Sequence, residues 1–372
     1  MPLSSIFLLV SSMDSGGAER VAASLANAWS ERGESITLVV TFSGRGQCFY
    51  PLAEPVKLLY LADYAGQLGR RPRAYWARFW ALRQLISGAR PDAVVSFLTN
   101  VNVAALLATA GLPCHVFVSE RTFPPARRMS WLLRALRRMT YPWASGVVML
   151  TAEGLRWLER RIPGAKGVVI PNPVRVPLPR GAPMRLPADV IAPERKLLLA
   201  VGRLDEGKQF DRLLQSFSTL APRHPAWDLA IVGEGPEGPA LQRQASALGL
   251  DARVRFPGLV GNVGDWYARA DLYVMTSRYE GFPNTLAEAM AHGRAAVSYD
   301  CDTGPRDIIR HERDGLLVSP VGDVAALTRS LDRLLADDAE RERMAAHAAE
   351  VRERYSVDKI LARWDELMQS GR

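Results

Sequence analysis

Short apolar runs alternate with amphipathic stretches along most of the chain, and this alternation constrains the fold more than any other feature. Strands separated by helices do not form hairpins, so the pattern predicts an α/β fold with a parallel, doubly wound sheet. The expected strands of the first half are Ser5–Ser11, Ile36–Thr41, Lys57–Leu61, Ala93–Phe97, His115–Ser119, Gly146–Leu150 and Gly167–Pro171.

The alternation stops once and then restarts. Residues 172–193 are rich in proline and lack a helical or strand period, which indicates a linker. Further strands are expected at Lys196–Val201, Ala230–Val232, Val254–Phe256, Asp271–Met275 and Ala295–Tyr299, before an end that is almost all helix-forming. A chain of 372 residues is long enough for two domains. We therefore predict an N-terminal domain over 1–175, a linker over 176–194 and a second domain over 195–355.

Composition excludes several classes of protein. The apolar share of 48% and charged share of 23% are typical of a globular protein, and no run approaches the length of a membrane-spanning helix. The apolar run Ile6–Ser12 lacks a basic lead and continues into a glycine loop, so we interpret it as a strand and not a signal peptide. Three scattered cysteines without metal-ligand spacing fit a reducing cytosol.

A glycine loop, Met13–Gly17, follows the first strand and precedes a helix expected over Ala18–Glu31. Ligands of α/β sheets bind at the carboxyl ends of strands, where this loop lies. The loop lacks the G-x-G-x-x-G pattern, which removes the main support for the hypothesis that the chain is an NAD-dependent enzyme. The alternative is a turn that only needs a positive φ.

Two loops of the second half have a similar position. Val201–Lys208 follows the first strand there, and its Arg203 and Lys208 have the charge to contact a diphosphate. Only five of the 47 basic residues are lysine, which makes Lys208 in a glycine-flanked loop notable. Val232–Pro236 is a glycine turn that ends the next strand. Taken alone, the first of these loops is more often a solvated turn.

A helix start near Pro283 is the strongest candidate site. Pro283 followed by Asn284 indicates a helix with Asn284 as its N-cap. The N–H groups of Thr285, Leu286 and Ala287 would then have no acceptor inside the helix. Free donors and the helix dipole together favour an anion at this point.

Two glutamates bracket this helix start, Glu280 before it and Glu288 about one turn inside. An anion site flanked by carboxylates suits a nucleotide-sugar, which has phosphates between two hydroxyl-bearing rings. Two glutamates alone are more often the end of a strand and a solvated helix residue. However, the run Glu280-Gly-Phe-Pro-Asn-Thr-Leu-Ala-Glu288 resembles the Glu-x7-Glu motif of retaining GT-B glycosyltransferases of family four. Flanking matches are Tyr279, Ala289, Met290, Gly293, Gly304 and Pro305.

The resemblance covers nearly the whole chain and is most specific over residues 202–315. It implies a GT-B fold, with two Rossmann-like domains that face a central cleft and a C-terminal segment, 356–372, that crosses back to the N-terminal domain. It implies transfer of a hexose or N-acetylhexosamine from a nucleotide-sugar, with a UDP-sugar as the first candidate donor. The transfer would retain the anomeric configuration and need no metal or other cofactor. The acceptor would be a glycan or a polyprenyl-diphosphate-linked oligosaccharide, because the nearest look-alikes extend bacterial lipid-linked or surface oligosaccharides.

The resemblance also assigns roles to individual residues. Glu280 would hold the donor sugar and Glu288 the ribose, while Arg203 and Lys208 would stabilise the leaving diphosphate. Further donor-side positions are Gly16, Gly17, Gly233, Phe256, Pro257, Gly258, Phe282, Pro283, Asn284, Thr285 and Leu286. No side-chain base is required, since the departing phosphate oxygen can take the acceptor's proton.

Two positions depart from the family pattern. Many relatives have a histidine at the end of an N-terminal strand, but here His115 begins that strand and Glu120 and Arg121 follow it. Either Glu120 or Arg121 takes the place of the histidine, or the role is absent. These two residues and Arg20 are expected on the acceptor side. Asp307 stands where a glutamate is common.

Asp300 and Asp302 have the Asp-x-Asp spacing of metal-dependent GT-A transferases. A metal would duplicate the positive charge that Arg203, Lys208 and the helix start already supply, so we expect no metal there.

Positive charge is concentrated in the first half. Residues 1–180 contain 22 Lys and Arg against 10 Asp and Glu, whereas the remainder contains 25 against 29. Arginines mix with Trp, Phe and Leu over Arg70–Leu85 and Arg127–Trp143, which suits helices lying on an anionic bilayer. The alternative is two amphipathic helices with solvated arginines. We expect a cytoplasmic protein, peripheral on the inner membrane, and no nucleic-acid partner because no recognition motif is present.

Two other functions fit the same residues. A nucleotide-sugar epimerase or hydrolase on this fold would turn over without an acceptor. A non-catalytic membrane-docking relative would bind no donor.

Overall fold

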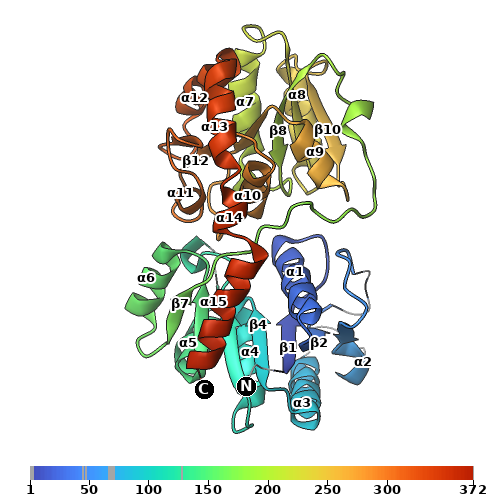
Figure 1. Cartoon of the computed structure of the whole chain (residues 1–372), viewed down its shortest axis with the longest axis vertical. Coiled ribbons are helices and arrows are strands. Elements are labelled where there is room, and N and C mark those ends of the chain that lie inside the picture. Colours follow the sequence, from blue (N-terminus) through green and yellow to red (C-terminus); the bar gives the residue numbers. More distant parts are fainter. Residues whose placement is uncertain (1–3, 44–45, 47, 66–71, 127–128, 372) are drawn as a thin grey trace. The chain divides into compact units, whose positions relative to one another are not determined.

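The computed structural model describes the chain except residues 1–3, 44–45, 47, 66–71, 127–128 and 372. It divides into two compact units (Figure 1). The first contains Met1–Pro173 together with Val357–Arg372, and the second contains Val174–Ser356.

A seven-stranded parallel sheet forms the centre of the first unit. Its order is β3-β2-β1-β4-β5-β6-β7. The strands are β1 (Ser5–Val10), β2 (Ser35–Val40), β3 (Lys57–Tyr60), β4 (Ala93–Phe97), β5 (His115–Ser119), β6 (Gly146–Met149) and β7 (Gly167–Val169). Every strand expected in this half is therefore confirmed. The five inner strands are almost wholly buried, as expected of a sheet covered on both faces, whereas the edge strands β3 and β7 are half-buried or exposed.

Helices cover both faces of this sheet. On one face, α1 (Gly17–Glu31) packs beside α15 (Val357–Ser370), and the Trp29 and Trp364 rings meet edge to face with centroids 5.8 Å apart. The C-terminal helix is thus part of the first unit. The remaining elements are α2 (Ala62–Ala65), α3 (Pro72–Ala89), α4 (Thr99–Thr109), η1 (Pro124–Ala126), α5 (Trp131–Thr140), η2 (Tyr141–Trp143) and α6 (Ala152–Arg161).

The second unit has a six-stranded parallel sheet in the order β10-β9-β8-β11-β12-β13. Its strands are β8 (Lys196–Val201), β9 (Trp227–Val232), β10 (Val254–Gly258), β11 (Leu272–Met275), β12 (Ala296–Tyr299) and β13 (Gly315–Val318). The strand β13 was not predicted from the sequence. Its place is fixed by pairing with β12, where a Cβ on Gly315 would lie 2.5 Å from the Ala296 carbonyl oxygen.

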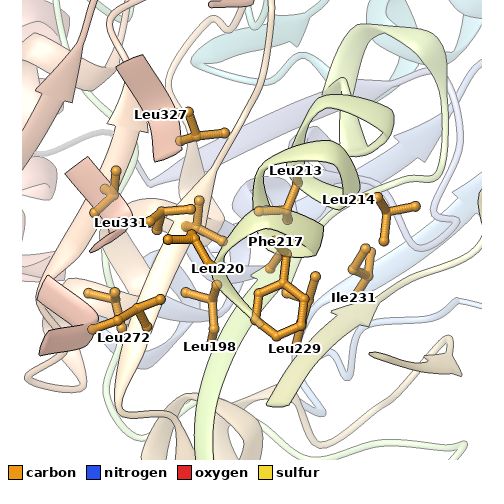
Figure 2. Close-up of a cluster of buried hydrophobic side chains, with 14 of the residues drawn as sticks. Leu198, Leu213, Leu214, Phe217, Leu220, Leu229, Ile231, Leu272, Leu327 and Leu331 are labelled. Atoms are coloured by element: carbon orange, nitrogen blue, oxygen red, sulfur yellow. The ribbon is translucent and has the colours of Figure 1, made fainter. Parts of the chain in front are cut away.

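The core of this unit lies between its sheet and α7 (Phe210–Leu220) with α12 (Val324–Ala336) (Figure 2). Apolar residues of α7 recur every three or four positions, so one face of the helix meets the sheet. The labelled side chains are Leu198, Leu213, Leu214, Phe217, Leu220, Leu229, Ile231, Leu272, Leu327 and Leu331. The other helical elements are η3 (Pro187–Asp189), η4 (Glu206–Lys208), α8 (Gly238–Ala247), α9 (Val263–Arg269), α10 (Asn284–Ala291), α11 (Pro305–Ile308), α13 (Asp338–Ala348) and α14 (Val351–Arg354).

The proline-rich segment 176–194 is hydrogen-bonded to the second unit. The Gly181 N–H donates to the Gly261 carbonyl at 2.9 Å, and the Arg185 N–H donates to Asn262 Oδ1 at 3.0 Å. This segment therefore belongs to the second unit by its contacts. Among the described helices, none has the length and apolar character that crossing a bilayer requires.

Candidate functional site

Three loops meet at the carboxyl edge of the second sheet, after the neighbouring strands β8, β11 and β12. The Thr276 hydroxyl donates to the Lys208 carbonyl at 2.7 Å, and the Arg278 N–H donates to the Gly207 carbonyl at 2.8 Å. The Thr303 hydroxyl donates to the Glu280 carbonyl at 2.5 Å. These contacts position the Lys208 and Glu280 side chains against each other.

Lys208 and Glu280 form an ion pair with a Nζ–Oε1 distance of 2.5 Å. The Lys208 side chain is 26% exposed to solvent and the Glu280 side chain 13%. Burial lowers the pKa of Lys208, but the Glu280 carboxylate, with smaller effects of Asp205 and Cys301, raises that pKa above its ordinary value. Lys208 is therefore an ammonium ion at neutral pH, and the pair holds a positive and a negative group in adjacent positions.

The helix start predicted near Pro283 is present but shifted by one residue. Pro283 is the N-cap and α10 begins at Asn284, so the expectation that Asn284 caps the helix is wrong. The Ala287 N–H donates to the Pro283 carbonyl at 3.1 Å, which also corrects the expectation that it is free. The N–H groups of Thr285 and Leu286 fall in the first turn, where no acceptor exists within the helix. The dipole of α10 points its positive end toward this loop.

Glu288 is buried in α10, so it is not a solvated helix residue. The Tyr267 hydroxyl donates to Glu288 Oε2 at 3.1 Å. A neighbouring phenol, Tyr273, has its pKa raised, first by burial and further by the Glu280 and Glu288 charges, while a hydrogen bond with Thr285 opposes this. Sequence reasoning missed both tyrosines because buried aromatic residues have no distinctive local pattern.

The glycine turn after β9 packs directly on the loop after β8. Gly233 has φ +140°, and a Cβ there would lie 2.0 Å from the Gly202 carbonyl oxygen. The Leu204 N–H donates to the Glu234 carbonyl at 3.0 Å. Gly233 is therefore required by close approach of the backbone. Arg203, in the loop after β8, is exposed and has no ion pair among the described side chains.

Other predicted donor-side residues use their side chains for packing. Phe256 is half-buried against the core of the second unit, and Pro257 is buried. Gly258, with φ +80°, accepts the Gly233 N–H at 2.9 Å. Phe282 is buried with its ring 5.2 Å from that of Tyr355. The Phe256 and Phe282 rings are therefore used for packing within the second unit.

The Asp-x-Asp pair is partly neutralised by a side chain of its own unit. Arg306 Nε donates to Asp300 Oδ1 at 2.9 Å, whereas Asp302 is exposed. Within the described part of the chain, no group of three or more His, Cys, Asp or Glu residues is arranged to hold a metal ion. Asp307 accepts the Gly304 N–H at 3.2 Å.

In the first unit the glycine loop precedes α1. Gly16 is the N-cap of this helix, and a Cβ there would overlap the Glu19 carboxylate, which accepts from the Ser12 hydroxyl at 2.9 Å. Gly17 is the first helical residue. Arg20 lies with its guanidinium carbon 5.4 Å from the centre of the Tyr50 ring.

Glu120 and Arg121 follow β5 and are both buried. Glu120 accepts from the Thr99 hydroxyl at 2.8 Å and from the Tyr141 hydroxyl at 2.5 Å, and Arg137 lies 3.8 Å away. Arg121 instead contacts Asn172. Thr99, Tyr141 and Arg137 were not expected at this site, because they come from elements distant in sequence.

The basic and aromatic stretches form α3 and α5, which both pack on α4. Their exposed aromatic side chains include Trp76 at 66% and Trp131 at 73%. Arg83 Nη1 donates to the Ala108 carbonyl at 2.8 Å, and Arg137 is buried, so neither arginine is placed to contact a bilayer as the sequence suggested. Arg70, Arg71, Arg127 and Arg128 lie outside the described residues.

Comparison with known proteins supplies the family. Residues 15–176 match the model of Glycosyltransferase Family 4, and residues 187–351 match the model of Glycosyl transferases group 1. An exopolysaccharide phosphotransferase of Streptomyces coelicolor is 30% identical over 97% of this chain, which spans only 40% of that relative's length. A Campylobacter jejuni enzyme, GalNAc-alpha-(1->4)-GalNAc-alpha-(1->3)-diNAcBac-PP-undecaprenol alpha-1,4-N-acetyl-D-galactosaminyltransferase, is 27% identical over 98% of each chain.

Among solved structures, Anabaena Alr3699/HepE in complex with UDP and glucose matches with a TM-score of 0.80 and 19% identity, over 99% of this chain and 100% of that one. The predicted α/β GT-B fold is thereby confirmed. With a family model matched by each half and this fold, the chain belongs to the GT-B glycosyltransferases of the family-four, group 1 type.

Proposed function

We propose that this glycosyltransferase moves a hexose or N-acetylhexosamine from a UDP-sugar to a glycan or polyprenyl-diphosphate-linked acceptor, with retention of configuration and without a metal. The observation that carries the proposal is the Lys208–Glu280 pair, held by three loops at the carboxyl edge of the sheet. The printed names of relatives support the substrates, since one acts on an undecaprenol-linked glycan and one structure contains UDP and glucose.

In the proposed mechanism the donor replaces the ion pair. The donor's diphosphate pairs with the Lys208 ammonium. Arg203 lies nearby in the same loop, and the first-turn N–H groups of α10 provide further hydrogen-bond donors. The sugar hydroxyls of the donor would donate to the Glu280 carboxylate, and the ribose hydroxyls are assigned to Glu288. As the bond to the sugar breaks, negative charge grows on the leaving diphosphate. Positioned donors of this kind each contribute about 10²–10³ in rate.

A matched pair of variants tests the assignment. Lys208→Ala and Glu280→Ala should fold and lose transfer, measured as sugar incorporated into an extracted lipid-linked acceptor. Lys196→Ala is the control, because Lys196 also forms a lysine–carboxylate pair, with Asp338 at 2.6 Å, but stands at the amino end of β8, whereas Lys208 lies in the loop after its carboxyl end. Full transfer by both site variants would refute the assignment.

Two further measurements separate the alternatives. Product analysis with donor alone should show little turnover, whereas an epimerase or hydrolase consumes the donor without acceptor. A thermal-shift screen of UDP-, GDP- and ADP-sugars should show stabilisation by the true donor, because a ligand that binds only the folded state raises its stability. A non-catalytic relative would respond to none of them.

We also propose peripheral attachment to an anionic membrane face through α3 and α5. Trp76 and Trp80 on α3 and Trp131 on α5 are more than half exposed, and the first half of the chain carries the excess positive charge. Exposed indole rings beside arginine suit the interface of an anionic bilayer.

A further inference from the structure

The two buried charged residues after β5 differ in how completely they are paired. Glu120 is 1% exposed, and both of its carboxylate oxygens accept the Thr99 hydroxyl, while one also accepts the Tyr141 hydroxyl. Arg137 adds a positive charge 3.8 Å away. A carboxylate held in this way is fixed in place and poorly available as a base or ligand group.

Arg121 has the opposite environment. It is 7% exposed, its Nη1 donates to Asn172 Oδ1 at 2.6 Å, and its guanidinium lies 3.5 Å from the centre of the Phe97 ring. Its Nε and Nη2 have no hydrogen-bond partner among the described residues. Burial lowers the pKa of Arg121 to about 9, and no carboxylate in the described part of the chain opposes this effect. A buried cation without a counter-charge is costly, so its retention needs an explanation.

The free edge of this guanidinium has a specific shape. Nε and Nη2 lie on the same side of the planar group, so two parallel N–H bonds point in one direction. This fork fits two oxygens of a phosphate or carboxylate. Asn172 occupies only the other side of the group, at Nη1, and so leaves the fork intact.

A second set of donors lies beside the same ring. Phe97 is followed by Leu98, which has φ +76°, a strained value for a side chain of this kind, and then by α4. Leu98 is the N-cap of α4 and, being apolar, gives it no side-chain cap, and the neighbouring Thr99 hydroxyl donates to Glu120. Strained backbone of this kind concentrates at ligand sites. The start of α4 and the Arg121 fork therefore both favour a negative group.

We propose that Arg121 and the start of α4 form a binding site for a phosphoryl group at the carboxyl edge of the first sheet. Glu120 is then a positioning residue, which fixes Thr99 and the backbone that carries Arg121. The chemistry of the site does not distinguish a nucleoside diphosphate from a diphosphate-linked acceptor. The identity of the ligand rests on the proposed function, whereas the binding of an oxyanion does not.

Binding measurements on the full chain test the site. Inorganic pyrophosphate is titrated into the Lys208→Ala protein, with and without Arg121→Met, so that the second unit contributes little. We expect Arg121→Met to weaken pyrophosphate about tenfold or more, the loss typical of a hydrogen-bonded charge. Arg121→Lys should recover part of the affinity, because it keeps the charge but not the fork.

Two arms identify the source of the phosphoryl group. If the donor supplies it, Arg121→Met weakens UDP about tenfold; if the acceptor supplies it, UDP binding is unchanged and KM for the diphosphate-linked acceptor rises by a similar factor. Unchanged pyrophosphate, UDP and acceptor parameters in Arg121→Met would overturn the proposal. A wild-type chain that binds pyrophosphate at Arg121 but transfers no sugar would instead count against the proposed function alone.

A matched control addresses folding. Arg137 is as buried as Arg121 and lies over the Trp157 ring, but it has the Glu120 carboxylate as a partner. Arg137→Met should lower the unfolding temperature because it leaves Glu120 buried without its counter-charge. Arg121→Met should leave it unchanged or raise it, and should remove the further rise that pyrophosphate gives. If Arg121→Met fails to fold, the titrations are made on Arg121→Lys, and a wild-type affinity for all three ligands there overturns the proposal.

Discussion

The Lys208–Glu280 pair predicts a measurable coupling between two residues 72 positions apart. The perturbation is a double-mutant cycle with Lys208→Met, Glu280→Gln and the combined variant. At 2.5 Å and an effective dielectric constant of about 20, the attraction is about 7 kcal/mol before desolvation is subtracted. Removing one partner of a buried pair costs about 3–5 kcal/mol. Since both side chains retain some exposure, we expect about 2–3 kcal/mol for each single change.

The combined variant should lose less stability than the two single changes added together. Removal of both charges leaves no unpaired ion, so we expect a coupling energy of about 2 kcal/mol. Native-state hydrogen exchange of amides in β8 and β11 measures the opening free energy of the second unit by itself. If the stability losses of the two single changes simply add up in the combined variant, the claim that Lys208 and Glu280 form a buried ion pair is refuted.

The pH dependence of the coupling follows from the pKa of Lys208. That pKa is raised in the folded chain, so the stabilisation is fully present below the unfolded pKa and disappears as pH rises through the folded value. Both values lie above pH 10, because the ordinary value is 10.5 and the shift is upward. The coupling should therefore be constant between pH 6 and about 9. A decline within this window would show that Lys208 titrates lower than its contacts require.

The remaining predictions concern the glycine turn, the membrane and metals. Gly233→Ala should destabilise the second unit by about 3 kcal/mol in urea unfolding, because its Cβ would overlap Gly202; Gly249→Ala, with φ +70° and open space, should cost only about 1–2 kcal/mol. Trp76→Ser and Trp131→Ser should each weaken sedimentation with anionic vesicles about tenfold, while neutral vesicles bind neither variant nor wild type strongly. EDTA should leave transfer unchanged, and a loss restored by Mg²⁺ or Mn²⁺ would contradict the proposed metal-free reaction.

The sheets could be predicted because each buried strand is a local run of apolar residues. The strand β13 was not predicted although it is as long as β11 and β12, and its pairing with β12 is a tertiary effect. The predicted start of α10 was also wrong by one residue. Asn284 is a residue type common at N-caps, but Pro283 has the extended backbone conformation of the N-cap.

Candidate site residues could be found, but their partners could not. Lys208 and Glu280 were both assigned to a ligand, and nothing in the sequence indicated that they would contact each other across adjacent strands. Arg137 was grouped with surface arginines because its neighbours are arginine and leucine, yet the fold buries it beside Glu120. Spacing along the chain identifies a residue type, whereas charge pairing depends on which strands are neighbours.

The ion pair also gives a physical reason for selecting an intact nucleotide-sugar under the proposed function. A free sugar would engage Glu280 and leave Lys208 without a counter-charge, while a nucleoside diphosphate would engage Lys208 and leave Glu280 unpaired. Either ligand must therefore bear the cost of separating the pair and leaving one ion partly buried. Only a molecule that brings phosphate and sugar hydroxyls together replaces both partners at once, so its affinity should exceed what the two fragments predict separately.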